Sequence, residues 1–221
     1  ITISTIDDAI SSEGSVTING GYLYCTSSEN DAIDSNGPLT ITGGVIVAIG
    51  AASPEGAFDC DNNTFAITGG TLVGIGGATS TPTTTATTQN VVILGSGTKD
   101  STISLMADDS TVVAFAFTIP QSYSTMLLSS PDIETGTEYT TYTGGTASGN
   151  ETFYGLYLGD LSYFDGTAGT SFTVSSTTNQ YQQTPLKDRP GQTGIKQPYR
   201  LLADAMGSTA QNTITILSRP T

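Results

Sequence analysis

Carboxylate and amide side chains recur at a regular spacing in the first third of the chain, and these are residue types that could do chemistry. Residues 8–21 (DAISSEGSVTINGG) and 31–44 (DAIDSNGPLTITGG) are identical at nine of fourteen positions, at an offset of 23. A third copy, AFDCDNNTFAITGG, spans residues 57–70 and carries one additional residue. Because every copy contains an acidic turn, a fold that stacks the copies would bring the acidic turns together.

The fold that these copies predict is a solenoid. Each unit contains a polar turn, a short strand, a Gly-Gly corner, a second alternating strand and a variable loop. Units of this length cannot bury a face alone and must stack, and strands this short leave no room for helices. We therefore expect an all-β fold, a parallel β-helix with a C-terminal β cap and an extended tail.

Stacking at this offset also predicts which residues share a position in successive coils. The glycine pairs at 20–21, 43–44 and 69–70 would supply a corner where φ is positive or where a Cβ would clash. Two internal rows of apolar side chains are expected, namely Ile10–Ile33–Phe58 and Ile18–Ile41–Ile67.

The rest of the chain is divided by its pattern. Residues 77–89 are rich in Thr, lack an apolar period and are expected to form a protruding loop. Strands are expected to resume at Asn90–Leu94, Ser101–Met106 and Thr111–Ile119. We assign residues 1–119 to β-helix coils, 120–177 to a C-terminal β cap region, and 178–221 to a polar linker, a short helix (Leu201–Met206) and a terminal strand (Asn212–Leu217).

Charge limits the classes of partner. The chain has 6 Lys and Arg against 20 Asp and Glu, which gives a formal net charge of −14. A surface of this sign repels phosphate backbones, so we expect no nucleic-acid partner, and it attracts divalent cations. No stretch of about 18 apolar residues occurs, so we expect no insertion into a membrane.

The acidic turns predict a calcium site. Equivalent residues of adjacent coils lie about 4.8 Å apart, which places Asp8 over Asp31, Asp34 over Asp59, and Asn36 over Asp61. Two like charges about 5 Å apart repel by roughly 3 kcal/mol at an effective dielectric of 20, and a hard cation with oxygen ligands reverses this repulsion. An alternative is that Asp and Asn serve only as turn residues. The expected ligands are Asp31, Asp34, Asn36, Asp59 and Asp61.

Aromatic residues provide a second candidate site. If Leu23 points inward, Tyr22 and Tyr24 point outward, where their rings could stack on sugar rings. Tyr154 and Tyr157 belong to a second aromatic cluster and are expected to contact a glycan in the same way. The neighbouring Phe153 and Phe164 are instead expected to cover an open end of the solenoid. Cys25 and Cys60 fall at different corners of the repeat and are not expected to form a disulfide.

Three segments resemble a known family. The runs NDAIDSNGPLTITGGVIVAIG (30–50), LLSSPDIETGTEYTTYTGG (127–145) and TSFTVSS (170–176) are similar to a bacterial family of cell-surface, carbohydrate-binding parallel β-helix proteins. The resemblance covers about residues 5–177 and corresponds to the C-terminal part of the family's domain. It implies a right-handed helix of pectate-lyase-like shape, bound calcium, and affinity for acidic plant polysaccharide or for cellulose, without catalysis.

These observations lead us to expect an extracellular or cell-surface, calcium-containing polysaccharide-binding protein that is not an enzyme. The first alternative is a structural subunit of a filament or surface assembly, built by end-to-end stacking or by exchange of the terminal strands Ile1–Ile3 and Thr213–Leu217. The second is a polysaccharide lyase or hydrolase. The chain has no His, and Lys99 is the only basic residue before residue 185, so few groups could serve as a base.

Overall fold

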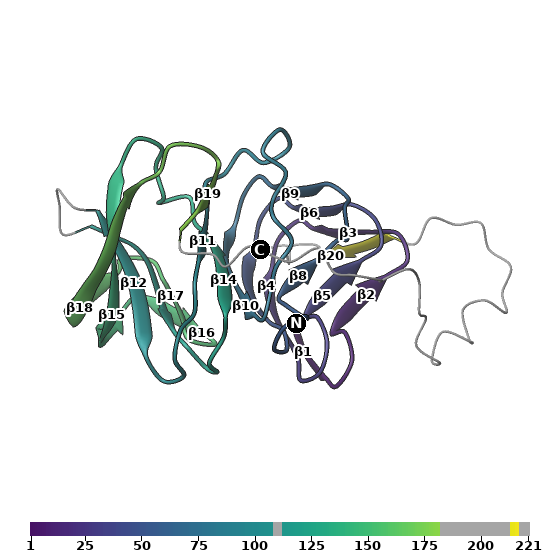
Figure 1. The fold of residues 1–221 in the computed structure, drawn as a ribbon, viewed down its shortest axis with the longest axis horizontal. Helices are drawn as coiled ribbons and strands as arrows, with labels where there is room; N and C mark the ends of the chain where they lie inside the picture. The colour runs from purple at the N-terminus through teal and green to yellow at the C-terminus, as the bar shows by residue number, and fades with distance from the viewer. Residues whose placement is uncertain (108–111, 182–212, 217–221) are drawn as a thin grey trace, which may run out of the picture.

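The structure, a computed structural model, describes residues 1–107, 112–181 and 213–216. The described residues form β-strands and no helix, and the strands belong to four sheets. No described element is a helix long and apolar enough to cross a membrane. Three of the sheets wrap around one core, and the fourth lies beside them (Figure 1).

Three successive coils repeat the same three strands. Parallel pairing joins each strand to its equivalent in the next coil, so the expected parallel β-helix is confirmed. The first coil contains β2 (Ile10–Ser12), β3 (Ser15–Ile18) and β4 (Tyr22–Ser27). The second contains β5 (Ile33–Ser35), β6 (Leu39–Ile41) and β7 (Val45–Ile49). The third contains β8 (Phe58–Asp59), β9 (Phe65–Ile67) and β10 (Thr71–Gly76), and β1 (Thr2–Thr5) pairs with β4 below the first coil.

The stacked apolar rows and the glycine corners are as expected. The backbone register aligns Ile10, Ile33 and Phe58, and also Ile18, Ile41 and Ile67, and all six side chains are buried. Burial of each such side chain contributes about 1.5–3 kcal/mol. The second glycine of each corner has a positive φ, which is 83° at Gly21, 103° at Gly44 and 99° at Gly70.

The middle strands of the largest sheet are buried on both faces. The order of this sheet is β1-β4-β7-β10-β14-β11-β19, with β11 (Val91–Leu94), β14 (Thr125–Ser129) and β19 (Thr178–Gln180). Along β7, Ile46 and Ala48 pack inside the coils, whereas Val47 and Ile49 pack outside against the fourth sheet. Two buried faces explain why β7, β11 and β14 are nearly continuous apolar runs.

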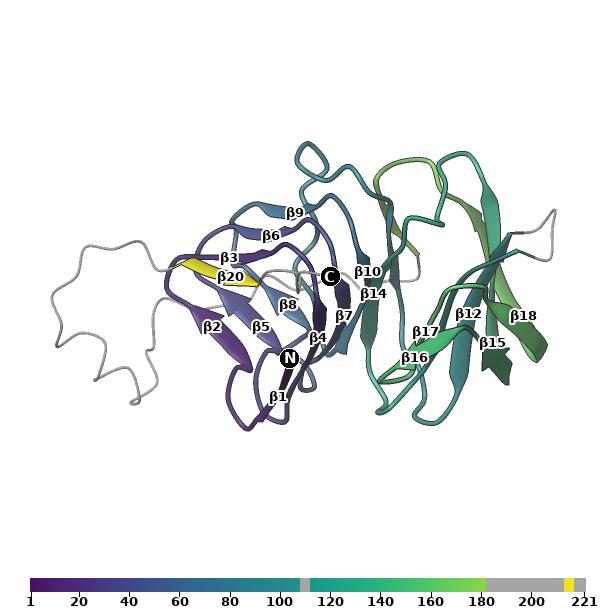
Figure 2. The same ribbon diagram turned by 180° about the vertical axis from the view of Figure 1, so that it is seen from behind.

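The fourth sheet is antiparallel and covers the outer face of the largest sheet, on the side away from the other coil faces (Figures 1 and 2). Phe115 and Phe117 contribute to the apolar layer between the two sheets. Its strands, in the order β16-β17-β13-β12-β15-β18, are β16 (Glu151–Phe153), β17 (Leu156–Leu158), β13 (Val113–Thr118), β12 (Thr102–Ala107), β15 (Glu138–Ser148) and β18 (Ser162–Thr173).

Parallel stacking ends earlier than residue 119, the boundary that the sequence suggested. Strand β14 lies between β10 and β11 and is antiparallel to both. The strands expected at 90–94, 101–106 and 111–119 are present as β11, β12 and β13, but β12 and β13 belong to the antiparallel sheet. Their sequences specify strands, and only the long-range pairing decides to which sheet they belong.

The threonine-rich segment 77–89 does not protrude. Its backbone N–H groups at Thr83 and Thr88 donate to Phe65 O and Ile67 O at 2.7 and 3.1 Å. The hydroxyl oxygens of Thr83 and Thr87 accept hydrogen bonds from the backbone N–H groups of Phe65 and Ile67. The segment therefore lies on the outer edge of β9 and satisfies it with hydroxyl and backbone groups instead of a strand.

The two ends of the tail that the structure describes are strands. Thr178–Gln180, expected to begin a linker, is β19 and pairs in parallel with β11. The expected terminal strand is confirmed as β20 (Thr213–Ile216), which pairs in parallel with β3. The rest of the linker and the helix expected at 201–206 lie outside the described residues.

The glycine corners give a test of the stacking. A Cβ at Gly44 would lie 2.8 Å from the carbonyl oxygen of Gly21, whereas a Cβ at Gly136, where φ is also positive at 87°, would meet no atom within 4 Å. Gly136→Ala is expected to lower the free energy of unfolding by about 1–2 kcal/mol from φ strain alone. Gly44→Ala should cost clearly more in urea titrations, because coils would have to separate. Equal losses would contradict the stacked corner.

Candidate functional site

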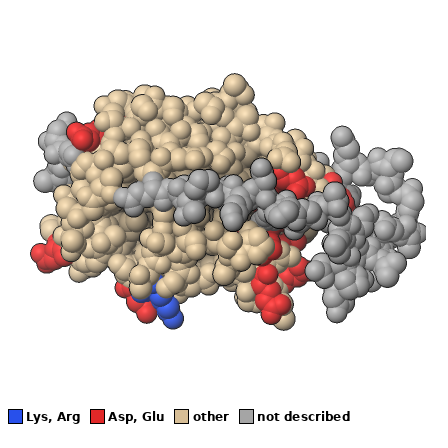
Figure 3. Space-filling model, viewed as in Figure 1, with Lys and Arg blue, Asp and Glu red and all other residues tan. Residues whose placement is uncertain are grey.

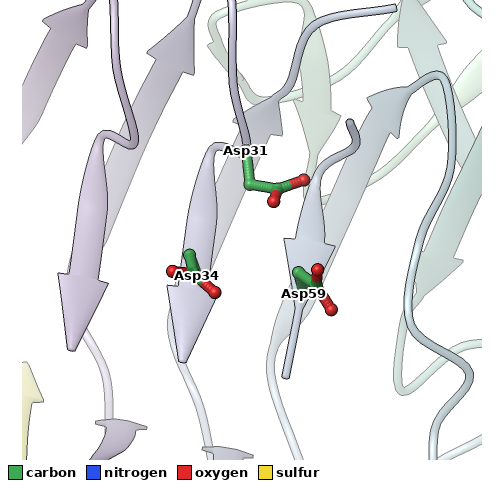
Figure 4. Close-up of side chains that lie close together, drawn as sticks. All are labelled: Asp31, Asp34 and Asp59. Carbon is green, nitrogen blue, oxygen red and sulfur yellow. The ribbon is translucent and has the colours of Figure 1, made fainter. Parts of the chain in front are cut away.

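The acidic turns converge on one corner of the solenoid. A carboxylate oxygen from each of Asp31, Asp34 and Asp59 lies within 4.8 Å of those of the other two. Asp34 and Asp59 are aligned by the pairing of β5 with β8, and Asp31 lies just before β5 (Figure 4). Asp31 is buried and the other two are half-buried. Three of the five predicted metal ligands therefore form one group, which we call the acidic corner.

Backbone and hydroxyl donors fix the carboxylates of the acidic corner. The Gly56 N–H donates to Asp31 Oδ1 at 2.6 Å. Asp59 Oδ1 accepts from the Asp61 N–H at 3.0 Å and from the Ser80 hydroxyl at 3.1 Å. The Ser11 hydroxyl of the coil below is 3.4 Å from Asp34 Oδ2. These donors come from four separate segments of the chain, so the corner forms only when the coils are stacked.

The other two predicted ligands lie outside this group. Asn36 donates from Nδ2 to Glu13 Oε2 at 3.2 Å, so its amide is directed to the first coil. Asp61 has a φ of 51° and an exposed side chain, and it is not part of the converging group. The additional residue of the third copy explains this difference. The turn between β8 and β9 is longer by one residue, and Asn63 instead of Asp61 bonds to the Asn36 carbonyl, at 3.0 Å.

Stacking shifts the acidity of two carboxyl groups. Burial, and then the charges of Asp8, Asp59 and Asp61, raise the pKa of Asp34 from 3.8 to about 7. Burial and the neighbouring Asp7 raise the pKa of Asp8 to about 6, although the N–H of Asp31 donates to Asp8 Oδ1 and opposes this shift. The ionised form of a carboxyl is disfavoured wherever desolvation and like charges act together. The corner therefore favours bound positive charge.

The spacing of the three carboxylates suits a hard cation such as calcium. Calcium binds oxygen at 2.3–2.6 Å, so two oxygens on one ion lie no more than about 5 Å apart, and the three carboxylates meet this condition. Asp31, Asp34 and Asp59 would hold the ion, and calcium would supply the positive charge that neutralises them. The Ser80 hydroxyl and Gly56 N–H would keep Asp59 and Asp31 oriented.

Three of the four predicted glycan-binding tyrosines also meet, although they come from distant parts of the chain. The rings of Tyr24 and Tyr154 are stacked, with centroids 3.7 Å apart and planes 9° apart. Tyr22 packs edge-on against Phe153 at 5.2 Å, and Phe153 packs edge-on against Tyr154 at 4.9 Å. As expected, Leu23 is fully buried. We call Tyr22, Tyr24, Phe153 and Tyr154 the aromatic cluster.

The hairpin turn of β16 and β17 positions the aromatic cluster. Tyr154 has a φ of 46° and is followed by Gly155 at 88°, the left-handed pair that a tight hairpin requires. Such a turn prefers Asn-Gly, and a bulky residue with positive φ is uncommon. Tyr154 Oη and Thr2 Oγ1 are hydrogen-bonded at 3.1 Å, and the Tyr22 hydroxyl donates to Glu151 Oε2 at 3.0 Å. Tyr22 and Tyr154 remain 44% and 46% exposed.

The remaining aromatic and cysteine residues have mixed outcomes. Tyr157 is hydrogen-bonded to Thr118 and packs on a separate apolar group around Ala116. Phe153, expected to cover an open end of the solenoid, belongs instead to the aromatic cluster. Phe164, expected in the same role, lies on β18 and is 64% exposed. No pattern in the sequence indicated that the turn at residues 153–155 would reach Tyr24. Cys25 and Cys60 are both buried and free, as expected.

The surface of the coils is acidic. In Figure 3, the Asp and Glu side chains, in red, gather over the coils, and Lys or Arg side chains, in blue, are visible at a single place on the same face. Lys99 is the only Lys or Arg in the part of the chain that the structure describes, and it lies between β11 and β12. The charges that shift the pKa of Asp34 are all carboxylates.

Comparison of the chain with protein-family models, with curated proteins and with solved structures yields no match. The fold and the two candidate sites therefore define the protein by class, as a parallel β-helix with an acidic corner and a partly exposed aromatic cluster.

The acidic corner predicts a pH-dependent stability. An aspartate releases its proton near pH 3.8 in the unfolded chain, whereas Asp34 holds its proton up to about pH 7 in the folded protein. The folded state binds more protons in this window, so in a chelator the free energy of unfolding should fall as pH rises from about 4 to 7. Asp34→Asn should flatten this fall in thermal melts, and Asp165→Asn, on exposed β18, should leave it unchanged. If Asp34→Asn left the fall of the free energy of unfolding with pH unchanged, the raised pKa of Asp34 would be contradicted.

Proposed function

We propose that this protein is a non-catalytic polysaccharide-binding β-helix of the cell surface or extracellular space, and that its acidic corner holds calcium. The observation that carries the proposal is the aromatic cluster. Tyr154 occupies a left-handed turn position that is unfavourable for a tyrosine, and it is half exposed beside Tyr22. Backbone strain of this kind persists mainly where the strained residue serves a function.

The cluster has the chemistry of a sugar platform. Sugar rings present C–H faces that pack on aromatic faces, and a tyrosine offers an apolar ring with one polar end. Glu151 and Thr2 lie at the hydroxyl ends of Tyr22 and Tyr154, so hydrogen-bonding groups surround the rings. Apolar faces with a few polar groups at their edges are typical of sites that bind small polar ligands.

The charge of the site favours neutral glycans at the aromatic cluster. Glu151 accepts from Tyr22, and Lys99, the one basic residue described, lies on a loop between other strands. An acidic polysaccharide would be repelled there unless calcium neutralised the charge. We therefore propose neutral polysaccharide as the primary ligand, and acidic polysaccharide as a ligand that depends on calcium.

A non-catalytic role is supported by the described residues around the acidic corner, which offer no basic side chain. A lyase on this scaffold would need a Lys or Arg within reach of the substrate and near calcium. Among the described residues, the groups that act on Asp34 and Asp8 are carboxylates, a serine hydroxyl and one backbone N–H, and none is a cation. The raised pKa of Asp34 is explained by the stack itself, and we assign the corner to holding successive coils together.

The aromatic cluster gives the test of glycan binding. Tyr154→Asn places a residue that prefers left-handed φ in the turn, so the variant should fold with little change in stability. It removes the exposed ring, and we expect affinity for insoluble cellulose to fall by about tenfold or more. Depletion isotherms on cellulose and polygalacturonate, with thermal melts of the same samples, measure both quantities.

Phe164→Ala is the matched control, because Phe164 is an exposed aromatic residue outside the cluster. It should retain the binding of the unchanged protein. Equal binding by the unchanged protein, Tyr154→Asn and Tyr22→Ala would contradict a role for the cluster, and retention on no glycan would contradict the proposed function.

The acidic corner gives a separate test of calcium. At pH 8, calcium at 100 times its dissociation constant should raise the free energy of unfolding by about 2.7 kcal/mol. The gain should shrink below about pH 7, where protons compete for Asp34. Asp34→Asn combined with Asp59→Asn should abolish the gain, and Asp165→Asn should retain it. Terbium luminescence and calorimetric titration report the binding directly, and an undiminished gain in the double variant would exclude the corner as the site.

A further inference from the structure

The coil strands β3, β6 and β9 lie side by side in one sheet, and the two edges of this three-strand set are closed in different ways. The order of the whole sheet is β20-β3-β6-β9. At the β9 edge, the threonine-rich segment provides hydroxyl and backbone partners. At the β3 edge, strand β20 is added from the far end of the chain. An uncovered strand edge is a template for pairing with another strand, so β20 occupies a place that another strand could take.

Strand β20 imitates one strand of a coil. Its sequence, TITI, has the same alternating pattern as SVTI in β3 and LTI in β6, and it resembles FAI in β9. The register places Ile214 and Ile216 at the positions of Val16 and Ile18, both of which are fully buried. The β3 edge therefore accepts a strand with apolar residues at alternate positions, as an additional coil would supply.

The chain between β19 and β20 is longer than the path within one molecule requires. Strand β20 lies at the level of β1, and β19 is six strand positions from β1 in the largest sheet. Six spacings of about 4.8 Å amount to about 29 Å. Residues 181–212 number 32, and an extended chain of that length spans up to about 105 Å. The length allows β20 to reach β3 of its own chain or of a neighbouring chain.

We propose that β20 is exchanged between copies of this chain, and that the β3 edge is an acceptor for β20 of a second copy. The backbone pairing of β20 with β3 is identical within one chain and between two chains. The protein concentration therefore decides which of the two pairings prevails. Pairing within one chain competes with an effective concentration on the order of millimolar. Exchange therefore prevails when copies are crowded, and each chain can donate to one neighbour and accept from another.

The strand geometry supplies a selective block of the acceptor. The Val16 N–H donates to Pro38 O at 3.0 Å, and Ile18 O accepts from the Thr42 N–H at 2.8 Å, so both residues face β6. Backbone groups alternate sides along a strand, so Thr17 faces β20. Thr17→Pro removes the N–H directed to β20 and preserves the bonds to β6, and proline is tolerated on such an edge. Thr17→Ala keeps the N–H and is the matched control.

Ile214→Pro blocks the donor in the same way, because it removes an N–H of β20. Each blocked full-length chain alone should be a monomer by size exclusion with light scattering. An equimolar mixture of Thr17→Pro and Ile214→Pro chains should contain a complex of twice the mass of one chain. Thr17→Ala in place of Thr17→Pro should give less complex, because its own β20 still fills its own edge. A mixture that stays monomeric at all concentrations up to the millimolar range would overturn exchange.

A peptide of sequence NTITIL keeps the proposal testable if Thr17→Pro fails to fold, which circular dichroism reports. The peptide should bind the Ile214→Pro chain, and adding Ser15→Pro, on the same side of β3, should weaken it by about tenfold or more. Absence of peptide binding would overturn the acceptor edge. Peptide binding without a complex between chains would confine the pairing to one chain and overturn exchange. All samples contain chelator and no glycan, so the outcome is independent of calcium and glycan binding.

Discussion

Parallel backbone pairing between successive coils places each residue about 4.8 Å from its equivalent in the next coil. Ile18, Ile41 and Ile67 therefore form a continuous apolar row, because like side chains stack favourably when they are buried. The same pairing superimposes Asp34 on Asp59. A sequence that repeats acidic turns for the sake of tight corners must therefore also repeat their charge, and the stack needs protons or cations at that corner.

The repeat contains most of the information about the coils. An offset of 23 residues, Gly-Gly corners and alternating apolar residues were enough to predict the stacked rows and the left-handed glycines. The set of side chains that converge at the acidic corner was predicted less well, because Asn36 and Asp61 were aligned by counting residues. One additional residue in the third turn moves Asn63, not Asp61, next to Asn36. Insertions in a turn change which polar atoms meet without changing the strands on either side.

Contacts between distant segments could not be predicted, because periodicity carries no information about them. Strands β12 and β13 were recognised as strands, yet their antiparallel sheet and its place on the outer face of the solenoid depend on apolar packing across more than 50 residues of sequence. The stacking of Tyr154 on Tyr24 depends on that placement. The threonine-rich segment failed the apolar criterion for a strand, although its hydroxyl groups suit it to closing a sheet edge. Both misjudgements concern polar or aromatic groups whose partners are remote in sequence.

The most direct test of the account is a site-resolved titration of the Asp34 carboxyl carbon by ¹³C NMR in the presence of chelator. Stacking of Asp34 against Asp8 and Asp59 in a half-buried corner predicts a midpoint at about pH 7, and a midpoint displaced to lower pH once calcium is added. A midpoint near pH 4 in chelator, unchanged by calcium, would contradict the stacked corner, because it would mean that stacking neither buries the Asp34 carboxyl nor places like charges beside it.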